Sequence, residues 1–268
     1  MDGKILPPIS VGVWIPKAKL GPTANFFRPL GMPSTFERLL DCAVAAHCVK
    51  MLAPYLHPAQ TLLNVFREPQ GAVIALQDTL DSPAATVALS LDLSKAFERV
   101  NPFWILQVLR RRGAPSWVCR YACYVLFGRA VRHKVQGRLL PPRRIHVGVD
   151  MGQSFSVLLF CVAMDPILCA LNSIQGVLNV QGYVDDTTVA GDVGGTMTWL
   201  GDVGSLLDSL RSAGIQVDPH TCWKVAAVTH SHPFRPCRLD DHPEFAWVHE
   251  LQGHATLHGA CSRISLLL

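Results

Sequence analysis

Three acidic side chains occur where this sequence predicts the ends of buried strands. Asp92 lies at the end of the near-alternating run Thr86–Leu93, which is typical of a buried strand. Asp185 and Asp186 lie at the tip of an expected hairpin over residues 182–189. Adjacent carboxylates at a turn repel each other, and a divalent cation relieves that repulsion. Three such carboxylates would suit two Mg²⁺ (or Mn²⁺) ions in phosphoryl transfer, whereas a lone Asp-Asp pair is more often a solvated turn.

The elements expected around these acids mix strands and helices without a strict alternation. Helices are predicted from the spacing of apolar residues and from capping signals such as Asn101-Pro102. In the first helix, Phe36, Leu39 and Leu40 share one apolar face with Ala43 and Val44. The fold class is therefore α+β. The predicted strands are 11–15, 86–93, 129–136 with 143–149 (as a basic hairpin), 182–189 (as a hairpin), 215–217 and 224–229. The predicted helices are 36–56, 69–80, 101–112, 116–128, 154–171 and 196–212.

Length and composition exclude several classes of protein. The chain has 268 residues, 49% of them hydrophobic and 16% charged, which allows a buried core and excludes a disordered chain. The longest apolar run, Val157–Met164, is far shorter than the ~20 residues of a membrane span. The acidic start Met1–Lys4 is unlike a signal peptide, and nine Cys without a C-x-x-C pair indicate reduced thiols. We expect an intracellular protein of the nucleus or cytoplasm, without a membrane partner.

The formal net charge of +4 is unevenly distributed along the chain. Residues Arg99–Val149 contain eleven Lys or Arg and no Asp or Glu, while the remaining residues carry 13 basic and 20 acidic side chains. Such a block suggests a polyanionic partner, and a solvated basic helix face is the alternative on charge alone.

Taken in order along the chain, these segments resemble a reverse transcriptase of the non-LTR retrotransposon type. The resemblance covers about residues 11–225, and the order of the motifs is more specific than any one of them. Four segments resemble the palm motifs of this family, in order: Leu91–Asn101, Gly148–Phe160, Tyr183–Asp186 and Ala213–Pro219. Two segments upstream, Trp14–Lys17 and Phe27–Leu30, resemble its fingers motifs. His57–Gln60 resembles the segment before the first palm strand.

The resemblance implies an RNA-directed DNA polymerase that joins a dNTP to a DNA primer on an RNA template. Asp92, Asp185 and Asp186 would be the catalytic, metal-binding triad for two Mg²⁺ or Mn²⁺ ions. Phe97 would be an aromatic gate against ribonucleotides, although a core aromatic is the alternative. The other implied substrate-binding residues are Lys17, Arg28, Met151 and Gly152, and the implied nucleic-acid-binding residues are Arg110, Arg111, Arg112, Arg129, Arg132, Lys134, Arg143 and Arg144.

The sequence departs from the family at three functional positions. Met151 stands where the family has a Gln that contacts the nucleotide, and Met cannot donate a hydrogen bond. Asp150 replaces an Arg and so puts an anion near the expected phosphate. Thr221 stands where a Lys is usual, a loss that would slow rather than abolish turnover. A truncated or degenerate copy of the enzyme would show such changes.

The predicted architecture is the fingers and palm of a right-hand polymerase, with an antiparallel palm sheet packed on helices and no thumb. The alternatives to an active enzyme are a catalytically dead nucleic-acid-binding remnant of a retroelement and an RNA-dependent RNA polymerase, against which Phe97 argues. Protein partners are not indicated. The expected divisions are partial fingers at 1–85, the first palm strand at 86–98, a basic insertion at 99–149, palm at 150–230 and a His-rich tail at 231–268, whose spacings match no zinc module.

Overall fold

The chain folds into two units in a computed structural model. Unit 1 comprises residues 1–56 and 97–163, and unit 2 comprises residues 57–96 and 164–268. The predicted helix 69–80 and strand 215–217 lie largely outside the described residues. The structure describes residues 9–16, 27–61, 74, 78–79, 86–91, 93–135, 137–192, 198–215, 224–229 and 232–236.

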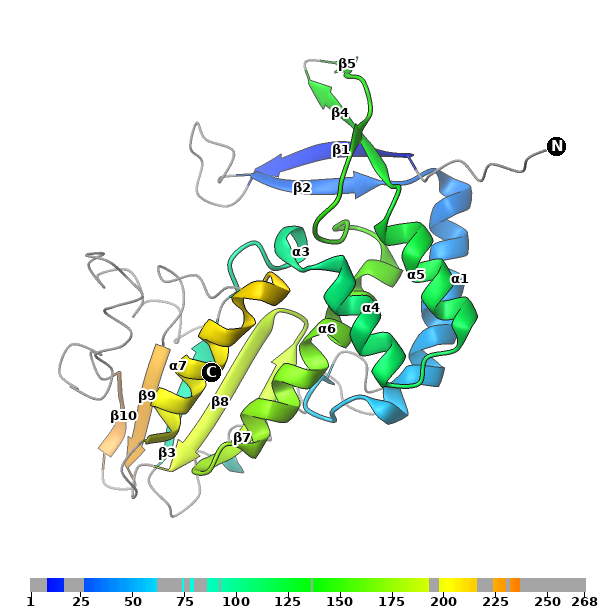
Figure 1. The fold of residues 1–268 in the computed structure, drawn as a ribbon. Helices are drawn as coiled ribbons and strands as arrows, with labels where there is room; N and C mark the ends of the chain where they lie inside the picture. Colours follow the sequence, from blue (N-terminus) through cyan, green and yellow to red (C-terminus); the bar gives the residue numbers. More distant parts are fainter. Residues whose placement is uncertain are drawn as a thin grey trace. The chain divides into compact units, whose positions relative to one another are not determined.

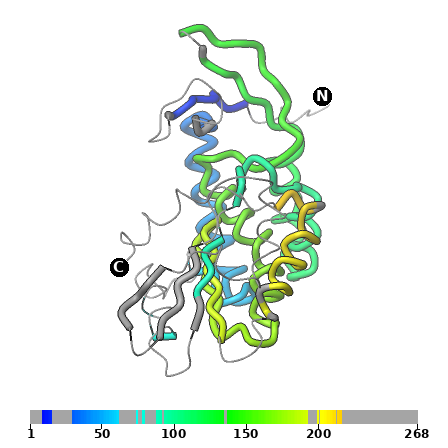
Figure 2. Tube along the Cα trace, turned by 90° about the vertical axis from the view of Figure 1, so that its left-hand side faces the viewer, coloured from blue at the N-terminus to red at the C-terminus, as the bar shows by residue number. Residues whose placement is uncertain are grey.

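Unit 1 contains a sheet in which the N-terminal strands meet the middle of the chain. Strand β1 (Ile9–Pro16) pairs antiparallel with β2 (Phe27–Met32) and parallel with β4 (Ala130–Val135). Strands β5 (Arg138–Leu139) and β6 (Arg143–Arg144) both pair antiparallel with β4. The β4–β5 hairpin projects away from helices α4 and α5 of the same unit in both views (Figure 1 and Figure 2).

The helices begin at the capping residues that the sequence provides. Ser34 and Glu37 form a reciprocal capping box before α1, and the Asn101 side chain accepts the Phe103 N–H (2.9 Å) before α4. Helix α5 begins after Pro115. The helices of this part of the chain are α1 (Thr35–Leu52), the 3₁₀ turn η2 (Ala53–Tyr55), α3 (Ala96–Arg99), α4 (Pro102–Arg111), α5 (Ser116–Leu126) and α6 (Ser154–Ser173).

Helix α1 buries a different face from the apolar one that the sequence shows. Phe36, Leu39 and Leu40 are exposed, and Phe36 keeps 76% of its surface accessible. The buried face includes Asp41, whose carboxylate accepts the Phe155 N–H at 3.0 Å. Burial raises the pKa of Asp41, although this hydrogen bond acts in the opposite direction. Because Phe155 lies in the first turn of α6, Asp41 satisfies an amide that the helix itself leaves unpaired.

Helix α6 is a core helix. It has 20 residues and is long and apolar enough, by length and composition, to cross a membrane. However, 72% of its most apolar stretch is buried inside the protein, and Phe155, Leu159 and Phe160 have no accessible surface. The division between the two units falls within this helix, after Ala163.

Unit 2 is built on a five-stranded antiparallel sheet in the order β10-β9-β3-β8-β7. Strand β3 (Thr86–Leu91) is central and pairs with β8 (Asp186–Asp192) and β9 (Lys224–Thr229). Strands β7 (Val177–Tyr183) and β10 (His232–Pro236) lie on either side. The antiparallel sheet predicted for the palm is therefore present.

Helices cover one face of this sheet through two close contacts. Leu168 of α6 lies against Gly182 of β7, and the buried Trp199 of α7 (Thr198–Ser209) lies against Gly191 of β8. The Trp199 indole N–H also donates to the Asp192 carbonyl (3.1 Å). Because side chains alternate between the faces of a strand, the buried Val189 shares the covered face with Gly191. A short 3₁₀ turn, η4 (Leu210–Ala213), follows α7.

We expect Gly191→Ala to destabilise the protein by about 1–3 kcal/mol, the usual cost of overpacking a core. A Cβ at this position would overlap the Trp199 ring and would lie 2.8 Å from the Gly176 carbonyl oxygen. The matched control is Gly201→Ala on the exposed side of α7, where a Cβ meets nothing within 4 Å. That change should stabilise the helix by about 0.5–1 kcal/mol. Urea denaturation measures both, and equal stabilities of the two variants would contradict the predicted contact.

Candidate functional site

The hairpin between β7 and β8 presents two adjacent carboxylates at its tip. Tyr183 and Asp186 are paired, so Val184 and Asp185 form a two-residue turn. Val184 has φ = +58°, an unfavourable conformation for a β-branched residue. Its N–H donates to the Gln60 side-chain oxygen at 3.1 Å. Asp185 is half-buried and Asp186 is exposed, so the acidic tip predicted from the sequence is formed.

The end of β3 lies beside this tip. Leu91 pairs with Thr187, the residue that follows Asp186. Asp92 follows Leu91 in the sequence and lies outside the described residues. Two hard oxygen donors on a rigid turn fit a divalent cation of the Mg²⁺ type, which takes one or two protein carboxylates together with other oxygen ligands. The two hairpin carboxylates are therefore oxygen donors of the kind that such a cation takes.

In unit 1, the loop that matches the second palm motif is fixed by its backbone. The Gly148 N–H donates to the Val100 carbonyl (2.9 Å), and the Val149 N–H donates to the Phe97 carbonyl (2.6 Å). Gly148 has φ = +78°, and a Cβ there would overlap the carbonyl groups of residues 97 and 98. The Met151 carbonyl accepts the Gly31 N–H at 2.9 Å. Main-chain contacts to the α3 region and to β2 thus hold this loop.

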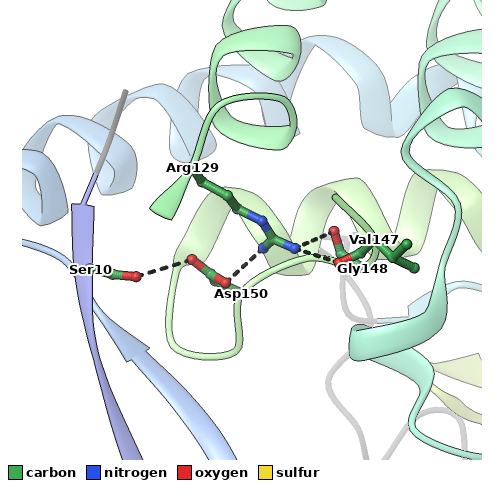
Figure 3. A network of polar contacts seen from close by, with 5 residues as sticks. All are labelled: Ser10, Arg129, Val147, Gly148 and Asp150. Atoms are coloured by element: carbon green, nitrogen blue, oxygen red, sulfur yellow. Dashed lines mark hydrogen bonds and ion pairs between the residues drawn. The ribbon is translucent and has the colours of Figure 1, made fainter. Parts of the chain in front are cut away.

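An ion pair between Arg129 and Asp150 also holds this loop (Figure 3). The Arg129 guanidinium contacts the Asp150 carboxylate at 2.7 Å and donates to the carbonyls of Val147 (2.7 Å) and Gly148 (2.8 Å). The Ser10 hydroxyl donates to the other Asp150 oxygen at 3.4 Å. Burial raises the pKa of Asp150, although Arg129 acts in the opposite direction.

Two expectations change because of this ion pair. Arg129 was expected at the nucleic-acid surface, but only 4% of its side chain is exposed and Asp150 neutralises its charge, so that expectation is wrong. Asp150, in turn, pairs with Arg129 and keeps 12% of its side chain exposed, whereas the sequence placed it as an anion near the expected phosphate. The sequence contains no local signal for the pair, because its members are 21 residues apart.

The remaining predicted substrate-binding residues come from a helix, a strand and a loop. Phe97 is half-buried and stacks on Phe160 of α6, with 4.8 Å between ring centroids. Gly152 has φ = +99°, and a Cβ there would lie 2.9 Å from the Leu30 side chain. Arg28 lies on β2, and Lys17 lies outside the described residues.

Two groups of exposed basic residues in unit 1 come from the basic block. The first is at the C-terminal end of α4, where Arg110 and Arg111 are exposed and Arg112 is half-exposed. The second is on the β4–β6 strands and includes Arg138, which the prediction omitted although it lies in the same basic block. The exposed members of the second group are Arg132, Lys134, Arg138, Arg143 and Arg144.

Comparison with known proteins identifies the family. Residues 15–235 match the family described as reverse transcriptase (RNA-dependent DNA polymerase). The chain is 25% identical over 230 residues to a retrovirus-related Pol polyprotein from the type-2 retrotransposable element R2DM of Drosophila melanogaster. This alignment covers 80% of this chain and 21% of the relative. The chain is also 26% identical over 149 residues to an uncharacterized 149 kDa protein of transposon TX1 of Xenopus laevis. That alignment covers 54% of this chain and 11% of the relative.

Solved structures show the same fold. Apo telomerase from Candida tropicalis, truncated from its C-terminal domain, superposes with a TM-score of 0.60 at 12% identity, over 80% of this chain and 49% of that chain. Telomerase from Candida albicans, in complex with a telomeric RNA fragment, superposes with a TM-score of 0.55 at 14% identity. The superposition covers 87% of this chain and 44% of that chain. The predicted α+β fold of polymerase fingers and palm is confirmed, as is the predicted non-LTR retrotransposon type. The chain, which spans about a fifth or less of those two curated relatives, belongs to the reverse transcriptase (RNA-dependent DNA polymerase) family.

Proposed function

We propose that this chain catalyses RNA-directed DNA synthesis, adding a deoxynucleotide to the 3′-hydroxyl of a DNA primer on an RNA template. The observation that carries the proposal is the acidic β7–β8 hairpin, whose strand β8 pairs with the end of β3 directly before Asp92. The primer oxygen loses its proton to solvent and forms a bond to the α-phosphorus. The bond between the α-phosphorus and the oxygen that bridges to the β-phosphate breaks, and pyrophosphate leaves. Positioning and charge neutralisation account for most catalysis of this kind.

Asp92, Asp185 and Asp186 would hold the two divalent cations in this reaction. When bound, such ions lower the pKa of the attacking hydroxyl and stabilise the leaving oxygen. Asp185 and Asp186 are adjacent on a two-residue turn, so the hairpin would supply both carboxylates from one short segment. We propose unit 2 as the palm on this basis.

Unit 1 would supply the nucleotide contacts as the fingers. The Phe97 ring, held by its stack on Phe160, is suited to exclude a ribose 2′-hydroxyl. Met151 and Gly152 would contact the nucleotide through apolar and main-chain atoms, since Met151 has no hydrogen-bond donor in its side chain. Lys17 and Arg28 would neutralise the triphosphate, Arg by bidentate contact and Lys as a point charge.

Primer extension on an RNA template tests this function directly. We expect incorporation of the complementary dNTP with Mg²⁺ or Mn²⁺, and its loss after addition of a chelator, because the triphosphate charge and the hairpin carboxylates both need a cation. Incorporation that is insensitive to the chelator, or no incorporation with either ion, would contradict the proposal.

The two groups of exposed basic residues would bind the template–primer backbone. We expect Arg143→Gln with Arg144→Gln to weaken binding and to reduce the slope of log K against log salt by about 1.4, if each residue neutralises one phosphate of a single strand. The control, Arg38→Gln with Lys50→Gln, removes two exposed charges from α1 outside the basic block. Fluorescence anisotropy of a labelled RNA measures both slopes, and identical slopes for the two double variants would refute the assignment.

A further inference from the structure

The turn that carries Asp185 is held in an unfavourable backbone conformation. Two-residue hairpin turns with a positive φ at their first position normally have Gly, Asn or Asp there. Here that position is Val184, with φ = +58°. A β-branched residue in this region persists only when its surroundings determine the conformation. Some other part of unit 2 must therefore hold the turn.

Gln60 supplies that contact from a segment far away in the sequence. Its side chain is buried, with 2% of the residue exposed, and its Oε1 accepts the Val184 N–H at 3.1 Å. The Gln60 backbone forms a parallel bridge with Gly182. The Gly182 N–H donates to the Ala59 carbonyl (2.8 Å), and the Thr61 hydroxyl donates to the Gly182 carbonyl (3.0 Å). Residues 59–61 thus extend the sheet beyond β7, beside the acidic tip.

The same segment is fixed to the core helix. The His57 N–H donates to the Asp165 carboxylate at 2.6 Å, and Asp165 has no accessible surface. The His57 ring accepts the Ala59 N–H at 3.2 Å, which stiffens the approach to Gln60. Asp165 and Leu168 lie on the same helix, and Leu168 contacts Gly182. The hydrogen bond from Val184 therefore links the turn to a buried, rigid element rather than to a mobile loop.

We infer that Gln60 is a positioning residue for Asp185 and Asp186. Its Oε1 fixes the amide of Val184 and so sets the direction in which the two carboxylates leave the turn. An amide suits this role because it accepts a hydrogen bond without adding a third negative charge beside the two acids. The inference rests on the proposed function, in which the positions of these carboxylates determine the rate.

The primary test is the primer-extension rate of Gln60→Met, which keeps the side-chain volume and removes the acceptor. We expect kcat to fall by up to about 10²-fold, the effect of misplacing catalytic groups by about 1 Å, and the Mg²⁺ concentration for half-maximal rate to rise. The KM for dNTP should change less than twofold, because Gln60 would not touch the nucleotide. The control Gln107→Met, an exposed Gln on α4, should leave all three parameters unchanged. A Gln60→Met variant with wild-type kcat and Mg²⁺ dependence would overturn the inference.

A double-mutant cycle separates positioning from a general loss of stability. Gly adopts positive φ without strain, so a Val184→Gly turn needs less support from Gln60. Gln60→Met should therefore cost clearly less in kcat in the Val184→Gly background than in the wild type. An equal cost in both backgrounds would refute a role through the Val184 conformation.

Hydrogen exchange of the Val184 amide gives a readout that does not depend on activity. Gln60→Met should accelerate exchange in the peptide that spans the β7–β8 turn, while Gln107→Met should leave it unchanged. If the wild-type protein extends no primer, the proposed function fails, and the exchange experiment still decides the inference. Equal exchange in the wild type and in Gln60→Met would overturn it.

Discussion

Replacing Asp185 and Asp186 together by Asn is expected to reduce primer extension by at least about 10³-fold, since the loss of even one electrostatic partner of a transition state costs about 10²–10³-fold. Asn keeps the size of the side chain and removes the charge that would hold the cations. The hairpin pairing depends on the backbone, so the variant should fold normally. Single-turnover extension on an RNA template measures the change.

Stability measurements distinguish this catalytic role from a structural one. Removing two adjacent like charges relieves repulsion at the turn, so we expect the free energy of unfolding to change by less than about 1 kcal/mol. The control is Asp208→Asn, which removes one exposed carboxylate that pairs with Arg211 at 3.0 Å on the surface. That variant should keep wild-type activity. Full activity of the hairpin variant would exclude Asp185 and Asp186 as metal ligands.

The parts of the fold that the sequence predicted are those specified by local physics. The hairpin 182–189 was predictable because an acidic pair separates two short apolar strands. The start of α4 was predictable because Asn101 and Pro102 are strong capping signals. The assignment of Asp185 and Asp186 to chemistry needed the order of motifs along the chain, because an isolated acidic turn has no specific meaning.

The errors concern residues whose environment comes from distant segments. The apolar face of α1 with Phe36 is exposed because Asp41, on the opposite face, binds the first turn of α6. The sequence indicates Gln60 only as part of the His57–Gln60 segment. Its sequence neighbours give no sign that its side chain contacts Val184, which is 124 residues away. Nothing in the sequence distinguishes Arg129 from the other basic residues of the block. Burial and pairing across the chain cannot be read from charge or periodicity alone.

Replacing Arg129 by Met is expected to destabilise the protein by about 3–5 kcal/mol, the usual cost of breaking a buried ion pair from one side. The variant leaves Asp150, whose side chain is only 12% exposed, without its counter-ion. It also leaves the carbonyls of Val147 and Gly148 without their donor. Arg211→Met, which breaks an exposed ion pair, should cost only about 0–1 kcal/mol. Urea denaturation compares the two. A loss as small for Arg129→Met as for Arg211→Met would mean that the ion pair does not stabilise the loop.

The pH dependence of the same variant identifies Asp150 as the source of the loss. Burial raises the pKa of Asp150 in the folded state, and removing Arg129 should raise it further. A folded-state pKa above the unfolded value means that the folded protein holds the proton more tightly, so stability falls as pH rises through this interval. The loss in the free energy of unfolding caused by Arg129→Met should therefore be smaller at pH 4 than at pH 7. Adding Asp150→Asn to Arg129→Met should remove this pH dependence and recover part of the stability, because no buried charge then remains. A deficit that is independent of pH would place the cost in the lost carbonyl contacts instead.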